Sequence, residues 1–375
     1  MTQVIIVGAG PAGATAAFFL ARSGVDVLLV DQATFPRYKT CGDGLGSMGM
    51  NMLAKMGLIE WVTSNEFNEI THVLTSSPNG NFIRTRPDPT ISTHNHVVPR
   101  IELDARLVET AVQAGARLRQ GTRITGIERL GADRVRLMTK TANSAETLQA
   151  PLVIAADGGQ ASFTRRLGLA SRAPEHVAMR AYYDGDVGDP RQIELHWDKS
   201  ILPGYGWVFP LGGGRANVGV GLHAADVKRL RLNLRDVLAT FVEENPHAQA
   251  RLKHATRVGA PKGHPIRTDA QSTSPYLDNV MIVGEAAGLV NPLTGEGIGP
   301  AMISGEIAAH YALCALESGD FTSNGLSAYG RAIRRRFIPR HYLARFACSL
   351  MSQAWLVNRA VWLGKIALKV SARSG

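Results

Sequence analysis

The N-terminal segment carries the feature that most constrains the fold of this chain. An apolar, β-branched run at Gln3–Val7 leads into the glycine-rich residues 8–13 (GAGPAG), and an alanine-rich helical pattern follows over Ala12–Ser23. A second apolar run, Val25–Val30, ends at Asp31. Strand, glycine turn, helix and strand in this order predict a βαβ unit in a parallel sheet.

The glycine spacing in this unit is G-x-G-x-x-G, which is typical of a dinucleotide-binding turn. Gly8 permits the tight turn, Gly10 lets the backbone approach a pyrophosphate, and Gly13 lets helix and strand pack closely. The helix N-terminus faces the phosphates, and Asp31 would bind ribose hydroxyls. Because an acid at this place disfavours a 2′-phosphate, NAD or FAD is expected and NADP is not. The predicted contacts are Gly8, Gly10, Ala12, Gly13, Asp31 and Gln32.

Further along the chain, apolar strand patterns alternate with segments of a different kind. Residues 152–158 and 280–285 each have the pattern of a buried strand that runs into glycine and an acid, whereas residues 71–98 and 178–222 have short alternating runs typical of antiparallel strands. We expect a mixed α/β fold: a Rossmann-like nucleotide domain interleaved with an antiparallel-sheet substrate domain, then C-terminal helices. The expected nucleotide domain comprises residues 1–70, 100–175 and 266–325, the substrate domain residues 71–99 and 176–265, and the basic helical region residues 326–375.

Three of these segments resemble the FAD-dependent group that includes the aromatic hydroxylases and the geranylgeranyl reductases. Residues 100–107 (RIELDARL) are similar to the group's R-x-x-x-D-x-x-L helix, residues 152–158 to its strand ending in Asp-Gly, and residues 280–305 to its strand–Gly-Asp–helix segment. The resemblance implies that the cofactor is FAD, with the backbone of residues 292–298 near the flavin atoms where negative charge grows on reduction. The further FAD contacts that it implies are Arg100, Asp157, Gly158, Glu285, Gly295, Gly297 and Ile298.

The chain departs from the group's pattern in two places. Glu285 stands where the group usually has Asp, so its carboxylate must reach the ribityl hydroxyls from one methylene further out. After Asp-Gly, Ala161 and Thr164 stand where Ser and Arg are usual.

Two other segments resemble the geranylgeranyl reductases more closely. Residues 36–44 (PRYKTCGDG) are similar to their P-x-x-x-x-C-G-[GD]-G stretch, and residues 204–210 (GYGWVFP), with 217–221 (NVGVG), to their Y-x-W-x-F-P hairpin. The resemblance implies an FAD-dependent reductase that saturates isolated C=C bonds of a prenyl chain by hydride transfer from reduced flavin. An FAD-dependent monooxygenase or halogenase on the same scaffold, in which reduced flavin meets O2, stays an alternative, as does a non-enzymatic flavoprotein.

Reduction of an isolated double bond needs a dry apolar tunnel, a flavin held against the alkene and a proton donor. Tyr205, Trp207 and Phe209 alternate on a strand and so share one face, either as the wall of that tunnel, binding substrate, or as a core aromatic ladder. Cys41, followed by Gly42, either lines the junction of flavin and substrate, where it would contact both and could help deliver the proton, or is a small buried filler.

The sequence offers no second G-x-G-x-x-G after a strand. We therefore expect the reductant, NAD(P)H or a ferredoxin-like protein carrier, to visit the flavin transiently. His94 and His96 lie on a strand pattern without a set of carboxylates, so we expect solvent-facing histidines and no metal site.

Positive charge is concentrated at the C-terminus. The chain has a net charge of +10, and residues 331–375 alone hold eight Arg and two Lys with no Asp or Glu. Helical spacing there combines these cations with tryptophans, which suits a helix lying on an anionic membrane surface. The alternative is a pair of helices that cap the substrate domain, and no motif indicates nucleic acid. Three scattered cysteines, no signal-peptide pattern and no spanning run favour a cytoplasmic protein, peripheral on the inner face of the cell membrane if the tail docks there.

Overall fold

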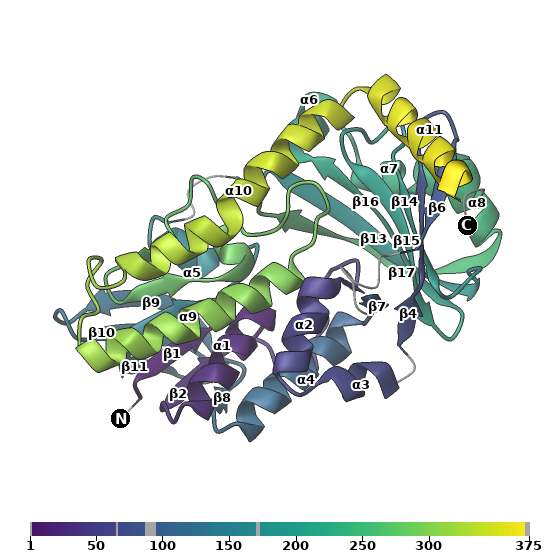
Figure 1. Cartoon of the computed structure of the whole chain (residues 1–375). Coiled ribbons are helices and arrows are strands. Elements are labelled where there is room, and N and C mark those ends of the chain that lie inside the picture. The colour runs from purple at the N-terminus through teal and green to yellow at the C-terminus, as the bar shows by residue number, and fades with distance from the viewer. Residues whose placement is uncertain (1, 65–66, 87–94, 170–172, 372–375) are drawn as a thin grey trace.

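The computed structural model describes residues 2–64, 67–86, 95–169 and 173–371. It is an elongated molecule with a six-stranded sheet in one half and a seven-stranded sheet in the other (Figure 1). Helices of the first half and of the C-terminus connect the two parts along one side.

The six-stranded sheet has the order β18-β19-β12-β1-β2-β8. β1 (Val4–Val7) lies in its centre, parallel to β12 (Leu152–Ala155) on one side and to β2 (Val27–Val30) on the other. All residues of these three strands are buried, which is why their sequences are continuous apolar runs. The outer strands are β19 (Val280–Ile282), β8 (Arg117–Arg119) and the antiparallel edge strand β18 (Tyr276–Leu277). The predicted parallel sheet is confirmed.

The helices α1 (Pro11–Arg22) and α9 (Ile298–Ser318) pack closely in the nucleotide-type half. Small residues make this possible: a Cβ at Gly305 would lie 2.3 Å from the carbonyl oxygen of Ala12, and one at Gly13 would lie 1.9 Å from that of Gly8. Gly13 therefore has the packing role that its spacing predicted. The other helices of this half are α2 (Ser47–Lys55), α3 (Ile59–Ser64), α4 (Arg100–Gln113), α5 (Ser162–Arg166) and the 3₁₀ helix η1 (Gly284–Ala287). One three-stranded sheet consists of β9 (Arg123–Arg129), β10 (Val135–Lys140) and β11 (Ala145–Ala150). Another consists of β3 (Gly44–Leu45), β7 (Asn95–Val97) and β4 (Asn68–Ile70).

The seven-stranded sheet has the order β17-β13-β16-β15-β14-β5-β6. It was expected to be antiparallel, and this is wrong for one pair, because β14 runs parallel to β5. The strands that form that pair come from segments far apart in the chain, so no hairpin links them. The strands are β5 (His72–Ser76), β6 (Phe82–Thr85), β13 (His176–Asp186), β14 (Gln192–His196), β15 (Tyr205–Gly212), β16 (Arg215–His223) and β17 (His254–Ile266).

Three helices, α6 (Ala224–Arg229), α7 (Leu234–Glu244) and α8 (Pro246–Leu252), accompany this sheet. Leu238 and Phe241 of α7 and Leu252 of α8 form a separate hydrophobic core with Val208 and Val218 of the sheet. Since side chains alternate along a strand, the residues between these core positions face the opposite side, where the sheet meets the nucleotide-type half.

The basic C-terminal region forms α10 (Ser327–Met351) and α11 (Ala354–Ser371). α10 packs on the first half through buried Tyr329, Ile333 and Phe337. α11 lies over the hairpin of β5 and β6, where Asn358 Oδ1 accepts a hydrogen bond from the Asn79 amide at 3.1 Å. α11 thus covers the edge of the seven-stranded sheet at β6. Within the described residues, none of the helices combines the length and the apolar character that crossing a membrane requires.

Candidate active site

One cavity of about 790 Å³ lies between the two large sheets. It extends from the glycine turn after β1, past residues 37–46, to the loop 290–298 and the inner face of the seven-stranded sheet. Of the residues predicted from the sequence, all but Gly13 line it. They are Gly8, Gly10, Ala12, Asp31, Gln32, Cys41, Gly42, Arg100, Asp157, Gly158, Tyr205, Trp207, Phe209, Glu285, Gly295, Gly297 and Ile298.

The glycine turn is built for close approach to a ligand. Gly8 has φ +104°, and a Cβ there would lie 2.3 Å from the Ala156 carbonyl oxygen, so the turn requires glycine. Gly10 has an ordinary φ of −73°, and the nearest atom to a Cβ there would be Arg37 Nη2 at 3.7 Å. The backbone of Gly10 and the Arg37 guanidinium thus border a space that an anionic group fits.

Asp31 lies at the rim of this space with both oxygens held by backbone. Its Oδ2 accepts a hydrogen bond from the Ala9 amide at 2.7 Å, and its Oδ1 accepts one from the Ala33 amide at 2.8 Å. Each carboxylate oxygen can accept a second bond, so the side chain is oriented and still able to bind a hydroxyl.

Asp104 holds two cations on the cavity wall. Arg100 donates to both of its oxygens at 2.7 Å, and Arg37 pairs with it at 2.8 Å. Arg100 and Asp104 are one helical turn apart on α4, which explains the R-x-x-x-D spacing. Sequence reasoning missed Arg37, although it lies within the segment 36–44 that the analysis singled out.

Asp157 is engaged with the chain itself. Its carboxylate accepts hydrogen bonds from the amides of Phe163 and Thr164 at 2.7 and 3.2 Å, and from the Thr164 hydroxyl at 2.5 Å. It therefore caps the start of α5. The departure at Thr164 has a structural reason here, because its hydroxyl contributes one of these bonds.

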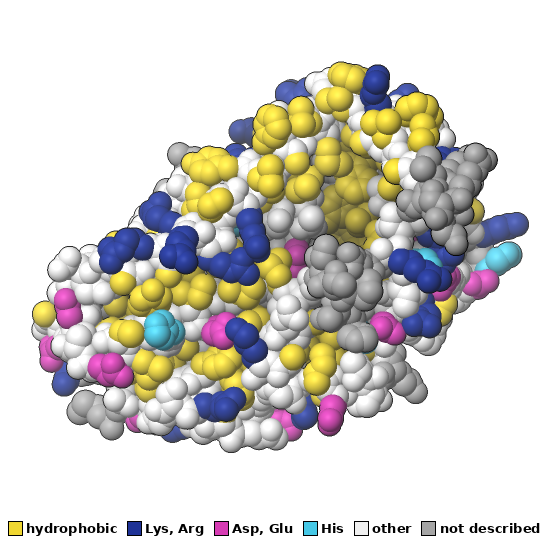
Figure 2. All heavy atoms as spheres, in the orientation of Figure 1, with side chains coloured by type: hydrophobic (Ala, Val, Ile, Leu, Met, Phe, Trp, Pro, Cys, Tyr) yellow, Lys and Arg dark blue, Asp and Glu magenta, His cyan; other side chains and the backbone are white. Residues whose placement is uncertain are grey.

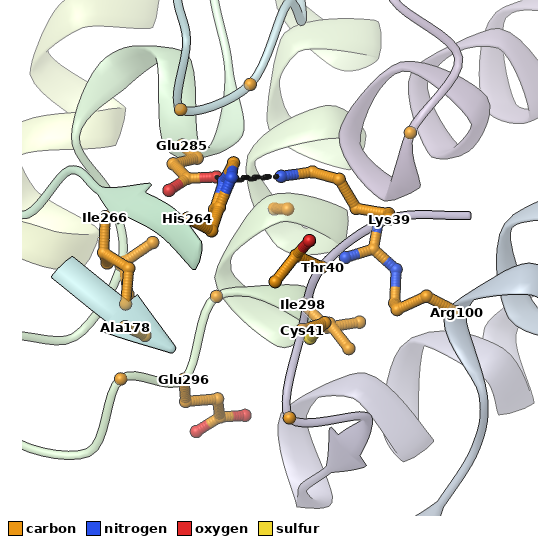
Figure 3. A pocket seen from close by; sticks show the side chains of 18 of the residues that line it. Lys39, Thr40, Cys41, Arg100, Ala178, His264, Ile266, Glu285, Glu296 and Ile298 are labelled. Carbon is orange, nitrogen blue, oxygen red and sulfur yellow. Dashed lines mark hydrogen bonds and ion pairs between the residues drawn. The ribbon is translucent and has the colours of Figure 1, made fainter. Parts of the chain in front are cut away.

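Glu285 faces a histidine and a lysine that the sequence analysis did not identify (Figure 3). His264 Nε2 lies 3.5 Å from Glu285 Oε2 and 2.5 Å from Lys39 Nζ. Burial lowers the pKa of Lys39, whereas the pKa of Glu285 is held low, against the effect of burial, by His264 and Lys39. A Cβ at Gly159 would lie 2.5 Å from Glu285 Oε1, so a glycine there makes room for the longer side chain.

A fourth missed residue, Asp43, anchors the segment 36–44 to the sheet. It is fully buried with φ +63°, a conformation that disfavours residues other than glycine. Its Oδ2 accepts from Asn217 Nδ2 at 2.7 Å and from the Tyr182 hydroxyl at 2.9 Å, and its Oδ1 accepts from the Arg100 amide at 3.2 Å. Burial raises the pKa of the Asp43 carboxyl group, and the hydrogen bonds from these three donors oppose that rise.

Asn217 also forms hydrogen bonds with the Cys41 loop and with the Trp207 ring. Its Nδ2 also donates to the Cys41 carbonyl at 2.7 Å, and its Oδ1 accepts from Trp207 Nε1 at 3.0 Å. The amide orientation set by Asp43 therefore fixes the Cys41 loop and the Trp207 ring together.

The aromatic residues of β15 form a continuous wall. Ring centroids of Tyr205 and Trp207 are 6.1 Å apart, and those of Trp207 and Phe209 are 6.2 Å apart. Trp207 lies over Gly219, where a Cβ would come within 2.3 Å of the indole. The Tyr205 hydroxyl donates to the Thr294 carbonyl at 2.5 Å, which ties this wall to the loop 290–298.

Beside this wall the sheet has a shallow trough. His264, Ala178, Gly221 and Tyr205 are neighbours across β17, β13, β16 and β15, so the two residues in the middle of the row have little or no side chain. All four line the cavity. A flat or narrow apolar group fits above Ala178 and Gly221.

The expectation for the histidine pair is wrong in part. His96 is buried, with 3% of its surface exposed, because β7 lies between β3 and β4, and it lines the cavity instead of facing solvent. His94 lies outside the described residues. Within those residues, no cluster of three or more His, Cys, Asp or Glu could hold a metal ion.

Comparison with known proteins decides the family. An FAD-binding domain model matches residues 1–196, and a geranylgeranyl reductase catalytic domain model matches residues 176–260. The menaquinone reductase of Mycobacterium tuberculosis (strain ATCC 25618 / H37Rv) is 34% identical over 82% of this chain and 75% of its own length. This chain belongs to the geranylgeranyl reductase family of FAD-dependent oxidoreductases.

Other members and neighbours agree with this assignment. Digeranylgeranylglycerophospholipid reductase 1 of Methanopyrus kandleri is 32% identical over 97% of the chain and 94% of its own length. The crystal structure of a geranylgeranyl bacteriochlorophyll reductase-like protein from Thermoplasma acidophilum superposes with a TM-score of 0.84 at 27% identity, covering 96% of this chain and 90% of that one. The flavin-dependent halogenase CmlS, at 22% identity and a TM-score of 0.77 over 90% of this chain and 63% of its own, shares the fold. The choice of FAD over NAD is confirmed by the FAD-binding domain.

Proposed function

We propose that the protein saturates isolated double bonds of a prenyl chain carried by a lipid, and that hydride comes from reduced FAD bound in the cavity. The observation that carries this proposal is a single cavity with two unlike ends. One end has the glycine turn and Arg37, and the other has an aromatic wall and a trough floored by Ala178 and Gly221. Menaquinone and digeranylgeranylglycerophospholipid, named for two relatives, both fit this chemistry.

The residues of the first end fit FAD. Gly8, Gly10 and Arg37 would hold the pyrophosphate, Asp31 the ribose, and the backbone of residues 295–298 the flavin ring. We assign Gln32, Arg100, Asp157, Gly158 and Glu285 to positioning of the cofactor or of its neighbours. When bound and reduced, FAD supplies hydride, a chemistry that no side chain provides.

The second end would hold the prenyl chain and exclude water. Tyr205, Trp207 and Phe209 present ring faces to the cavity, and the trough beside them lets a narrow chain approach the sheet backbone. Hydrogen bonds fix Tyr205 to Thr294 and Trp207 to Asn217, so the wall is rigid where the double bond must lie close to the reacting atoms. Cys41 and Gly42 would lie at the junction of cofactor and substrate.

The reductant in this proposal, NAD(P)H or a ferredoxin-like carrier, binds transiently. The sequence contains one G-x-G-x-x-G motif after a strand, and the FAD proposal uses it.

We further propose that the C-terminal helices dock on an anionic membrane surface, which would place the protein peripherally on the inner face of the cell membrane. Eight large apolar side chains, here called the apolar ridge, are 40–70% exposed along α10 and α11 (Figure 2). The exposed cations Arg334, Arg335, Arg340 and Arg359 belong to the same helices. Cys348 of α10 lines the cavity, so a lipid leaving the surface would have a short path inward. The apolar ridge comprises Tyr342, Leu343, Phe346, Leu350, Trp355, Trp362, Leu363 and Ile366.

An anaerobic half-reaction tests the main proposal. The FAD-loaded protein is reduced with one equivalent of dithionite, and a geranylgeranylated lipid that has no quinone ring is added. We expect the oxidised flavin spectrum to return with the substrate and not with its fully saturated analogue. Flavin that stays reduced until oxygen enters would contradict the proposal and would favour a monooxygenase or halogenase.

A further inference from the structure

Saturation of a double bond requires a proton as well as a hydride. The π bond breaks and two C–H bonds form: one carbon receives hydride and the other a proton, so the alkene is reduced and the flavin is oxidised. An isolated alkene is a weak base, so the proton must come from an acid that lies in the cavity and holds its proton at neutral pH.

Most acids that line the cavity are committed to other partners. Asp31 accepts two backbone hydrogen bonds, and Asp157 accepts three from the start of α5. Glu285 lies with His264 and Lys39. The oxygens of all three carboxyl groups are thus engaged by the chain itself, and in Asp157 these hydrogen bonds oppose the rise in pKa that burial causes.

Glu296 is different. It belongs to the loop 290–298 and lies two residues after Thr294, whose carbonyl accepts the Tyr205 hydroxyl. Its Oε1 is buried and has no hydrogen-bond partner within the described part of the chain. Figure 3 shows its carboxyl group on the cavity side, below Cys41 and Ile298.

The carboxyl group lies against glycines at the starts of two helices. Oε1 would lie 3.1 Å from a Cβ at Gly46 and 2.9 Å from one at Gly299, at the starts of α2 and α9. Tyr205 is near enough to interact electrostatically with Glu296, and burial raises the pKa of the Tyr205 hydroxyl. Although two helices begin here, none of their described amides donates to Glu296, and burial raises the pKa of its carboxyl group.

We propose that Glu296 is the catalytic acid that protonates one carbon of the substrate double bond. This rests on the proposed function of the cavity. After transfer, the Glu296 carboxylate takes a proton from solvent before the next turnover.

The test compares Glu296→Gln, which keeps the shape and removes the proton, with the matched control Glu317→Gln at an exposed position on α9. Both proteins are loaded with FAD, reduced anaerobically and mixed with substrate in a single turnover. Because a general acid contributes roughly 10²–10⁴-fold, we expect reoxidation by the alkene to slow at least about 100-fold in Glu296→Gln only. Reoxidation by O2 needs no alkene protonation and should stay unchanged, which shows that the flavin site is intact.

A second readout is independent of turnover. Infrared difference spectra of the FAD-loaded protein should show the C=O stretch of a protonated carboxylic acid at neutral pH, and Glu296→Gln should lack that band. Wild-type rates in Glu296→Gln, or an ionised Glu296 at neutral pH, would overturn the inference while leaving the proposed function in place. A wild-type protein that reduces no prenyl substrate, whatever the infrared result, would instead overturn the proposed function.

Discussion

Replacement of Gly10 by valine should separate cofactor binding from folding. Gly10 has φ −73° and ψ −174°, which valine adopts readily, and the nearest atom to its Cβ would be the end of the Arg37 side chain at 3.7 Å. Because Gly10 caps the start of α1, where valine is a poor residue, we expect a loss of about 1 kcal/mol in the free energy of unfolding of the apoprotein.

The effect on FAD should be much larger. The valine side chain would occupy the space in which the pyrophosphate meets the backbone and Arg37. Loss of two hydrogen bonds to a charged group, at about 1.5–3 kcal/mol each, amounts to about 3–6 kcal/mol. This corresponds to an increase of about 10²–10⁴-fold in the Kd for FAD.

The assay is FAD titration, followed by quenching of flavin fluorescence, alongside urea unfolding of the apoprotein. Gly8→Ala is the contrasting variant, because its φ of +104° and a 2.3 Å approach to Ala156 require glycine, so it should destabilise the apoprotein as well. A Gly10→Val protein that purifies with a full complement of FAD would refute the placement of the pyrophosphate.

Three other predictions concern the Asp43 hydrogen bonds, His176 and the apolar ridge. Asp43→Asn places a donor among three donors, so it should lower the free energy of unfolding by about 2 kcal/mol and change the indole fluorescence. Tyr182→Phe should lower it less. Equal stability of Asp43→Asn and wild type in urea would contradict these hydrogen bonds. Burial lowers the pKa of His176 to about 4, so the unfolded chain binds a proton at higher pH than the folded chain. The free energy of unfolding should therefore fall by up to about 3 kcal/mol between about pH 6.5 and 4. His176→Gln should reduce this fall in unfolding measured against pH. Trp355→Glu with Trp362→Glu should weaken sedimentation with anionic vesicles, whereas Val112→Glu, at an exposed site on α4, should not. Unchanged binding of the double variant would contradict docking through the apolar ridge.

Much of the nucleotide half follows from local sequence, because each of its features is encoded within a few neighbouring residues. The buried runs of β1, β2 and β12 and the spacing of Gly8, Gly10 and Gly13 determine strand, turn and helix without reference to the rest of the chain. The aromatic face of β15 is likewise a consequence of alternation along one strand.

What the sequence could not reveal are contacts between segments far apart in the chain. Lys39 and His264 are 225 residues apart and meet only because the segment 36–44 crosses the face of the seven-stranded sheet. Asp43 received no role from the sequence, since neither its left-handed conformation nor its bond to Asn217 has a local signal. His96 was misplaced for the same reason: strands that bury it on both sides come from elsewhere in the chain.

The mass of the lipid product shows whether the protein saturates a double bond of the prenyl chain. The reduced, FAD-loaded protein is incubated anaerobically with a geranylgeranylated lipid that has no quinone ring, and the lipid is analysed by mass spectrometry. The proposal predicts a product with two more hydrogen atoms, in an amount equal to the flavin reoxidised. It predicts two deuterium atoms when reduction and reaction both run in D2O, because dithionite supplies only electrons and the N–H groups of reduced flavin exchange with the solvent. A lipid of unchanged mass beside reoxidised flavin, or a product that has gained oxygen or halogen, would contradict it.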